Sequence, residues 1–281
     1  MRSFRSMTMS MVLLGLLALP VLAQSPGSPG PAPASPTPSL LSLPGLSLVA
    51  VGDSIPFNSP DDCPDCTGFV DLYADAVGAA TGREVTVRNL SQHNGLQVDG
   101  LRQELRSDAL RMGALSAADV IVVSIATNDV PWNISDDACD GPSEKVSWSK
   151  YTEACTAAEV ARLTPKYEEV FQRIVTLREG KPTILRALGR YNDWIGWPGE
   201  AVPPEAVAAT VAVVAAWQDM VCRAAEASGF LCADLATRFN GPDGTEPSGG
   251  LLADDYTHPS DKGNEAIAEV LIDLGFAPLV E

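Results

Sequence analysis

The sequence predicts an α/β fold, a three-layer α/β/α sandwich in which helices cover both faces of a parallel five-stranded sheet. Three observations support this prediction. Short apolar segments alternate along the chain with longer segments of helical periodicity. One short segment, Ala118 to Ile125, is continuously apolar, which is typical of a parallel strand buried on both faces. Parallel strands need long crossover connections, and the helical segments between the strands supply them.

Each expected element is placed by its own local pattern. The expected strands are short and rich in apolar or β-branched residues. They span residues 46–52, 84–90, 118–125, 183–188 and 230–235. The expected helices carry apolar residues at three- and four-residue spacing, and most end near a glycine. They span residues 70–80, 98–111, 158–178, 204–227 and 264–274. Together these segments predict one domain over residues 46–281.

The beginning of the chain has the pattern of an export signal. Two arginines precede a short apolar run, Met11 to Leu19, and small residues follow it up to Ala23. We therefore expect a signal peptide over residues 1–23, followed by a Pro-, Ser- and Gly-rich linker over residues 24–45. The alternative is an uncleaved membrane anchor, but the run is shorter than the roughly 20 apolar residues that span a bilayer. The sequence thus predicts a secreted, extracellular protein without a stable membrane span after cleavage.

The charge of the chain restricts its partners. The formal net charge is −17 at pH 7. Nucleic acids and anionic lipids both require clustered Lys and Arg, so this charge argues against either as a partner. An apolar fraction of 46% is sufficient for the core of a domain of this size.

The cysteines predict disulfides. An even number of cysteines, six, in an exported chain favours three bridges. Pairing neighbours along the sequence gives the simplest set, Cys63–Cys66, Cys139–Cys155 and Cys222–Cys232. A thioredoxin-type redox pair or a zinc site at the first two cysteines is the alternative. A zinc site would need further ligands, and the chain has only two histidines, so we expect no metal.

Polar residues follow the expected strands at positions that suit catalysis. In open parallel sheets, sites form where loops leave the carboxyl ends of the strands. Ser54 follows the first strand, Gly95 lies in the loop after the second, and Asn128 follows the third. Asp255 and His258 come after the last strand. We expect all five residues at one edge of the sheet.

These residue types predict nucleophilic catalysis by a serine. A serine hydroxyl needs a base to take its proton, and histidine is suited to this near neutral pH. Ser54 is the expected nucleophile and His258 the base, with Asp255 orienting the imidazole through its Nδ1–H. The negative oxygen of a tetrahedral intermediate needs hydrogen-bond donors. The backbone N–H groups of Ser54 and Gly95 and the side-chain amide of Asn128 can supply three.

The same motifs resemble those of the SGNH/GDSL hydrolases. They stand in the family's order at Gly52-Asp53-Ser54, Gly95, Ala126-Thr127-Asn128-Asp129 and Asp255-Tyr256-Thr257-His258-Pro259, and the resemblance covers about residues 46 to 275. It implies a flavodoxin-like fold and ester hydrolysis without metal or cofactor. It also implies the roles given above for the serine, histidine, aspartate, glycine and asparagine. One departure is Ala126, where the family usually has glycine.

The resemblance leaves the substrate open. Family members include lipases, lysophospholipases, thioesterases and carbohydrate O-acetylesterases. We expect a monomeric hydrolase that cleaves carboxylic esters of small molecules, lipids or glycans through an acyl-enzyme on Ser54. A carbohydrate O-acetylesterase or acyltransferase with the same catalytic residues is the main alternative. A non-catalytic binding module on the same fold is a further one.

Several aromatic residues are candidates for the substrate pocket. Trp132, Trp194 and Trp197 lie in loops after the third and fourth expected strands and can wall an acyl or sugar site, or simply pack those loops. His93, beside Gly95, can contact substrate or be an ordinary loop histidine. The insertion over residues 131–156 begins close to Asn128 and can shape the entrance of the site.

Overall fold

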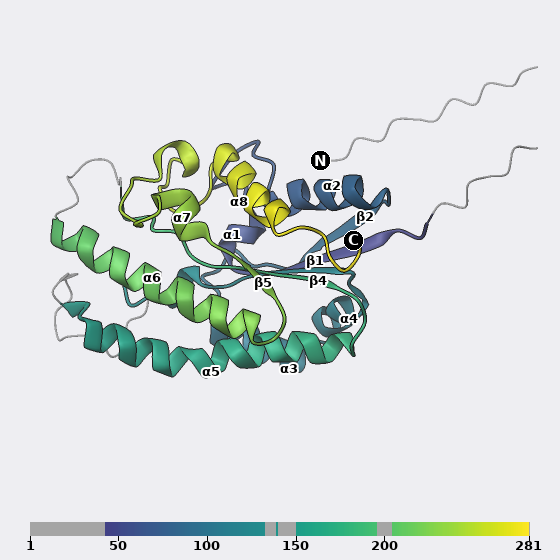
Figure 1. Cartoon of the computed structure of the whole chain (residues 1–281), viewed down its shortest axis with the longest axis horizontal. Coiled ribbons are helices and arrows are strands. Elements are labelled where there is room, and N and C mark those ends of the chain that lie inside the picture. Colours follow the sequence, from purple (N-terminus) through teal and green to yellow (C-terminus); the bar gives the residue numbers. More distant parts are fainter. Residues whose placement is uncertain (1–42, 133–138, 140–149, 196–203, 281) are drawn as a thin grey trace, which may run out of the picture. The chain divides into compact units, whose positions relative to one another are not determined.

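One parallel sheet organises the chain in the computed structural model, which describes residues 43–132, 139, 150–195 and 204–280 (Figure 1). Its five strands are ordered β2-β1-β3-β4-β5. In chain order they are β1 (Leu46–Gly52), β2 (Val85–Asn89), β3 (Val120–Ser124), β4 (Ile184–Leu188) and β5 (Leu231–Ala233). This order is that of flavodoxin-like folds, and the predicted α/β fold is confirmed.

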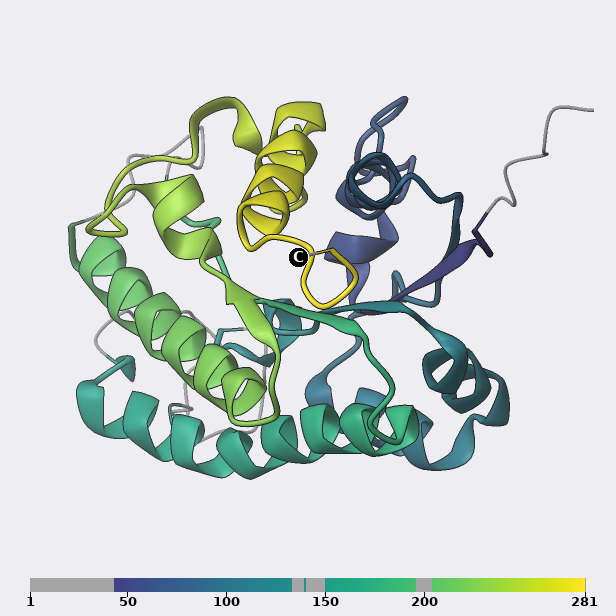
Figure 2. The same cartoon turned by 45° about the vertical axis from the view of Figure 1, so that its right-hand side comes forward.

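Helices cover both faces of the sheet. On one face lie α2 (Phe69–Thr81), α7 (Leu235–Asn240) and α8 (Asp261–Asp273) (Figures 1 and 2). On the other lie α3 (Val98–Ser107), α4 (Ala109–Ala117), α5 (Glu153–Arg178) and α6 (Pro204–Glu226). A single turn of helix, α1 (Ser54–Phe57), follows β1. The prediction of three layers is therefore confirmed.

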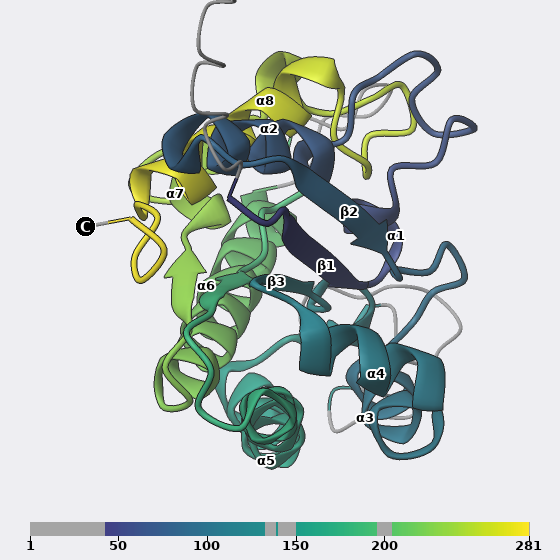
Figure 3. The same cartoon turned by 90° about the vertical axis from the view of Figure 1, so that its right-hand side faces the viewer.

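The central strand β1 contributes to two separate cores. It pairs with β2 on one side and with β3 on the other, as Figure 3 shows. Val49 and Val51 pack into the core under α3 to α6, whereas Leu48 and Ala50 pack into the core under α2 and α8. All four side chains are fully buried because successive residues of a strand point to opposite faces. This is why the strand is continuously apolar.

The expected helix over residues 98–111 was wrong, because two helices, α3 and α4, occupy this segment. Asp108 between them has an extended backbone (φ −87°, ψ 98°), and its carboxylate accepts hydrogen bonds from the N–H groups of Leu110 and Arg111. Aspartate in this position satisfies N–H groups that a new helix leaves open, so the chain restarts rather than continues.

Other helix boundaries differ for the same reason. The N-terminal caps Thr152 and Ser260 start α5 and α8 earlier than expected, at Glu153 and Asp261. Asp234 caps the short helix α7, which the sequence pattern did not predict. Among the described helices, α6 is long and apolar enough to cross a membrane, but Trp217 within it is fully buried in the core.

The cysteines form three bridges, Cys63–Cys66, Cys139–Cys155 and Cys222–Cys232. No described cysteine is free. The expected signal peptide over residues 1–23, almost all of the expected linker and most of the insertion over residues 131–156 lie outside the described residues.

Candidate active site

The end of β1 places Ser54 at the edge of the sheet. Gly52 has φ of +155°, and a Cβ atom there would lie 1.7 Å from the carbonyl oxygen of Ser124 on β3. Only glycine therefore permits β1 to approach β3 this closely. Asp53 then caps α1 by accepting a hydrogen bond from the N–H of Ile55 at 3.0 Å. Ser54 is the first residue of α1, and its side chain is nearly buried.

A buried carboxylate joins this turn to the next one. Asp53 Oδ2 accepts a hydrogen bond from the backbone N–H of Thr127 at 3.1 Å. Burial raises the pKa of Asp53 to about 6, against the opposing effects of the two backbone N–H donors and the charge of Arg190. Arg190 also donates to the carbonyl oxygen of Thr127 at 3.0 Å and to Asp193 at 2.8 Å.

His258 lies against Ser54 from the other end of the chain. Its Nε2 atom is 2.9 Å from Ser54 Oγ, and its Nδ1 atom is 2.5 Å from Asp255 Oδ2. The other oxygen, Asp255 Oδ1, accepts hydrogen bonds from the backbone N–H groups of Thr257 and His258, each at 3.0 Å. Burial opposes the charge of Asp255, but the His258 ring and the two N–H groups together lower its pKa. Asp254 is exposed.

Helix α8 holds the histidine loop onto the serine side of the site. The fully buried Asn264 accepts a hydrogen bond from the N–H of Phe69 at 3.0 Å and donates to Asn58 Oδ1 at 3.2 Å. It also donates to the carbonyl oxygens of Pro259 and Ser260, directly after His258. One amide thus connects the segment after α1, the start of α2 and the histidine loop.

Two hydrogen bonds connect the loop of Gly95 to the loop of Asn128. Asn128 Nδ2 donates to the carbonyl oxygen of Leu96 at 3.1 Å, and Gln97 Nε2 donates to the carbonyl oxygen of Asn128 at 3.0 Å. The Asn128 amide has two hydrogens, so one remains for another acceptor. Gly95 has φ of +71°, a conformation that favours glycine.

Asp129, the residue after Asn128, holds the same turn in place by hydrogen bonds. Its carboxylate accepts hydrogen bonds from the Tyr167 hydroxyl at 2.6 Å and from the N–H of Val98. Burial raises the pKa of Asp129 to about 7, although these two donors act in the opposite direction. The first turn of α3 and the middle of α5 therefore both support the residue next to Asn128.

Two of the three tryptophans predicted for the pocket lie together. The rings of Trp132 and Trp194 meet edge-on with centroids 6.3 Å apart, and Tyr151 packs edge-on against Trp132 at 5.8 Å. The Arg190 guanidinium lies 5.7 Å from the centroid of Trp132, which links this aromatic group to the turn of Asn128. Trp197 lies outside the described residues.

His93 contacts a carboxylate that sequence reasoning missed. Its Nε2 atom is 2.9 Å from Asp62 Oδ2, and the same oxygen is 3.5 Å from His258 Nδ1. The ligand atoms of these three side chains lie within 4.8 Å of one another, so among the described residues they form a set that could hold a metal ion. Asp62 lies in the loop between α1 and α2, and no motif marks it.

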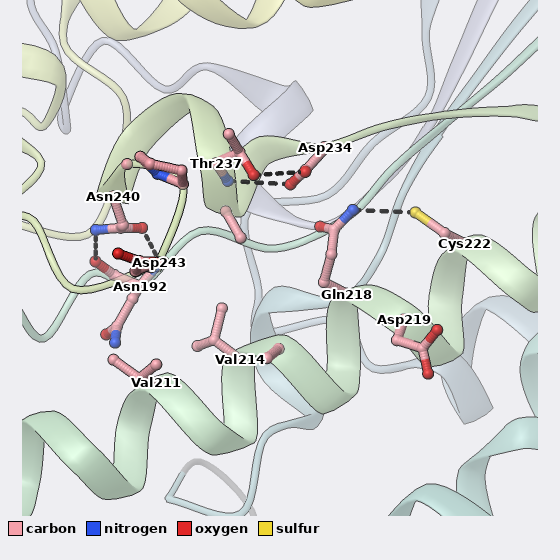
Figure 4. A pocket seen from close by; sticks show the side chains of 15 residues that line it. Asn192, Val211, Val214, Gln218, Asp219, Cys222, Asp234, Thr237, Asn240 and Asp243 are labelled. Atoms are coloured by element: carbon pink, nitrogen blue, oxygen red, sulfur yellow. Dashed lines mark hydrogen bonds between the residues drawn. The ribbon is translucent and has the colours of Figure 1, made fainter.

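A cavity away from this arrangement has a different lining. It lies between α6 and α7, has a volume of about 360 Å³ and is lined by residues that include Asn192, Val211, Gln218 and Asn240 (Figure 4). Gln218 accepts a hydrogen bond from the N–H of Arg190 and donates to Cys222 Sγ. None of the residues predicted for catalysis lines this cavity.

Comparison with known proteins gives a consistent result. The sequence profile described as "GDSL-like Lipase/Acylhydrolase family" matches residues 50–266. The lipase Lip_vut3 from a goat rumen metagenome is 20% identical, with a TM-score of 0.63, over 83% of this chain and 99% of that chain. None of the curated proteins matches.

Two further structures share the fold. The extracellular lipase of Streptomyces rimosus is 15% identical, with a TM-score of 0.54, over 83% of this chain and 100% of that chain. A catalytic mutant of the acetylxylan esterase Axe2 from Geobacillus stearothermophilus is 19% identical, with a TM-score of 0.52, over 85% of this chain and 97% of that chain.

Proposed function

Because this chain belongs to the GDSL-like lipase/acylhydrolase family and is a carboxylic ester hydrolase, we propose that Ser54 is its nucleophile and His258 its general base. The observation that carries this proposal is the 2.9 Å contact between Ser54 Oγ and His258 Nε2, with Asp255 on the opposite nitrogen. A base must lie within hydrogen-bond reach of the proton that it removes, and this contact meets that condition.

The reaction proceeds in two steps. His258 Nε2 takes the proton of Ser54 as Oγ attacks the ester carbonyl, and the resulting imidazolium is stabilised by Asp255. The oxygen of the tetrahedral intermediate accepts hydrogen bonds from the N–H groups of Ser54 and Gly95 and from the free amide hydrogen of Asn128. His258 then gives its proton to the departing alcohol, which leaves an acyl group on Ser54. Water, deprotonated by His258, releases the acid in the second step.

The aromatic group beside the site supports two candidate substrate classes. Trp132 and Trp194 offer flat apolar faces next to the turn of Asn128, which suits an acyl chain or a sugar ring. A carbohydrate O-acetylesterase is therefore the second candidate, and the fold that the chain shares with an acetylxylan esterase is compatible with it. A series of nitrophenyl esters of increasing chain length, assayed beside acetylated xylan, separates the two.

Secretion is part of the proposal. Its support is the predicted signal peptide together with the three disulfides, which persist in oxidising compartments. Intact mass of the protein exported by its native host tests it. A chain that begins near Gln24 and carries no free thiol is expected, and a retained N-terminus would contradict it.

Replacement of the nucleophile tests the chemistry directly. Ser54→Ala is expected to abolish ester hydrolysis, and a fluorophosphonate is expected to label Ser54 alone. Ser91→Ala is the matched control, because Ser91 is also nearly buried and its Oγ has no hydrogen-bond partner. Label on another serine, or hydrolysis by the Ser54→Ala protein at the parent rate, would exclude Ser54 as the nucleophile.

A further inference from the structure

A second carboxylate lies beside the histidine of the proposed catalytic group. Asp62 Oδ2 is 3.5 Å from His258 Nδ1, the nitrogen that also contacts Asp255. The same oxygen is 2.9 Å from His93 Nε2. The Asp62 carboxylate therefore lies between the two histidines of the chain.

The backbone fixes Asp62 in this place. Its N–H and the N–H of Cys63 both donate to the carbonyl oxygen of Ser59, each at 3.1 Å. The disulfide Cys63–Cys66 closes the loop immediately after Asp62. On the opposite side, the ring of His93 stacks on Phe57 of α1 with centroids 5.7 Å apart.

Burial gives the charge of Asp62 more influence than its distance suggests. Its side chain is 14% exposed, whereas that of Asp255 is 37% exposed. Electrostatic interactions weaken as water screens them, so a buried carboxylate acts more strongly at a given distance. Asp62 Oδ2 is itself buried and receives no hydrogen bond of ordinary geometry. The two histidine rings are the groups closest to this oxygen that can carry a compensating positive charge.

We propose that Asp62, held by His93, is a positioning residue for His258 that stabilises its imidazolium form and partly replaces Asp255 when that carboxylate is lost. This inference rests on the proposed function, in which His258 is the base. During the attack by Ser54, the proton enters at Nε2 and the ring becomes positively charged. Asp255 and Asp62 then face the charged ring at Nδ1 from two directions.

Two other charged or titratable groups lie near His258. Asp193 is buried and interacts with the charge of His258, but it is paired with Arg190 at 2.8 Å. His93 contributes positive charge only when protonated, and its Nε2 contacts Asp62 rather than His258. Among the described residues, the carboxylates that face Nδ1 of the ring are thus Asp255 and Asp62.

Kinetics of single and double variants test the proposal. In the parent protein, Asp62→Asn is expected to lower kcat by about 3- to 10-fold. In the Asp255→Asn protein, the same substitution is expected to have an effect at least tenfold larger than in the parent. It is also expected to move the acid limb of the kcat/KM profile to lower pH by about 0.5, because loss of an anion weakens proton binding. Asp61→Asn is the matched control, since it removes the neighbouring, exposed carboxylate.

Variants of His93, which contacts Asp62, also test the proposal. His93→Ala is expected to lower kcat in the same direction as Asp62→Asn, whereas His93→Gln, whose amide can still donate to Asp62, is expected to restore most of it. Equal effects of Asp62→Asn in the parent and in the Asp255→Asn protein would overturn the proposal. So would effects no larger than those of Asp61→Asn.

A crystal structure of the Asp255→Asn protein supplies a measurement that needs no activity. The distance from His258 Nδ1 to Asp62 Oδ2 is expected to shorten from 3.5 Å to hydrogen-bond length, about 2.7–3.2 Å. A His258 ring that turns away from Asp62 would refute the inference even in an active enzyme. A parent protein that hydrolyses no ester would refute the proposed function instead, while this distance would still decide the role of Asp62.

Discussion

The carboxylate of Asp53 accepts a hydrogen bond from the backbone N–H of Thr127, and this contact connects the residue before Ser54 to the residue before Asn128. The same carboxylate accepts from the N–H of Ile55, so its two oxygens serve two donors. The proposed nucleophile and one proposed oxyanion donor are therefore positioned by one buried side chain.

Replacement of this side chain is expected to damage both stability and rate. In Asp53→Asn, the new NH2 group must face one of the two N–H donors, because an amide has only one oxygen. We expect a loss of about 1–3 kcal/mol in the free energy of unfolding and a clear fall in kcat. Chemical denaturation and steady-state kinetics measure the two effects. An Asn variant with the parent's stability and rate would show that the contact is dispensable.

Activity is expected to fall on acidification, because the proposed base His258 must be unprotonated to take the proton of Ser54. The lowered pKa of Asp255 keeps that carboxylate ionised while His258 takes up its proton, whereas Asp53, with a pKa of about 6, can add a second proton to the acid limb. The kcat/KM profile between pH 4 and 9 measures it. His258→Ala should be nearly inactive at every pH, and a slope of two protons would point to a second essential group.

The two adjacent aspartates are expected to differ in importance. Asp255→Asn should lower kcat by roughly 10²–10⁴-fold, because it removes the carboxylate that stabilises the imidazolium. The reduction in kcat should lie near the lower end of that range, and KM should change little. Asp254→Asn should stay within about tenfold of the parent, since Asp254 is exposed and His258 Nδ1 contacts Asp255. Melting temperatures exclude misfolding. A larger loss of activity in Asp254→Asn than in Asp255→Asn would show that Asp254, rather than Asp255, orients His258.

The stability of the protein is expected to depend on Asp129. Its pKa is about 7 in the folded protein and near 3.8 in the unfolded chain, so between these values the folded state binds the extra proton. Stability from this group is therefore greatest at low pH and is lost as the pH rises from about 4 through 7. Asp129→Asn should flatten this dependence in melting curves taken from pH 4 to 8. Asp254→Asn, with an exposed carboxylate, is the control and should leave the slope unchanged.

The disulfides are expected to contribute according to the length of chain that they close. Cys222–Cys232 joins residues 10 apart, and Cys63–Cys66 joins residues 3 apart. Replacement of the first pair by alanine should cost about 3 kcal/mol, roughly 1 kcal/mol more than replacement of the second, because the longer loop has more entropy to lose. Urea denaturation of the two double variants tests the order.

The fold was accessible from the sequence because its strands are buried on both faces. Segments such as Val120–Ser124 must be apolar throughout, and that pattern is local. The break at Asp108 was not accessible in this way. The apolar spacing of α3 runs on into α4, and one capping aspartate changes the direction of the chain without interrupting that spacing.

The proposed site was predictable to the extent that its residues follow strands or belong to a recognisable motif. Ser54 comes directly after β1, at the edge where parallel strands end, and His258, which lies between α7 and α8, was located by the Asp-x-x-His spacing. Asp62 lies between α1 and α2, in a segment without such a motif, and reaches His258 through the packing of its loop. A pattern in the sequence cannot record such a contact, because it depends on the positions of two loops in space.

The connection that Asn264 makes between the two ends of the domain has a consequence for biosynthesis. Ser54 is synthesised early, whereas His258 is added 204 residues later and is held in place by its own loop and by the helix that follows it. A polypeptide still on the ribosome carries the serine without its proposed base. We therefore expect the hydrolase to become active as one of the last events of its own folding, and truncation within the final helix to leave an inert protein.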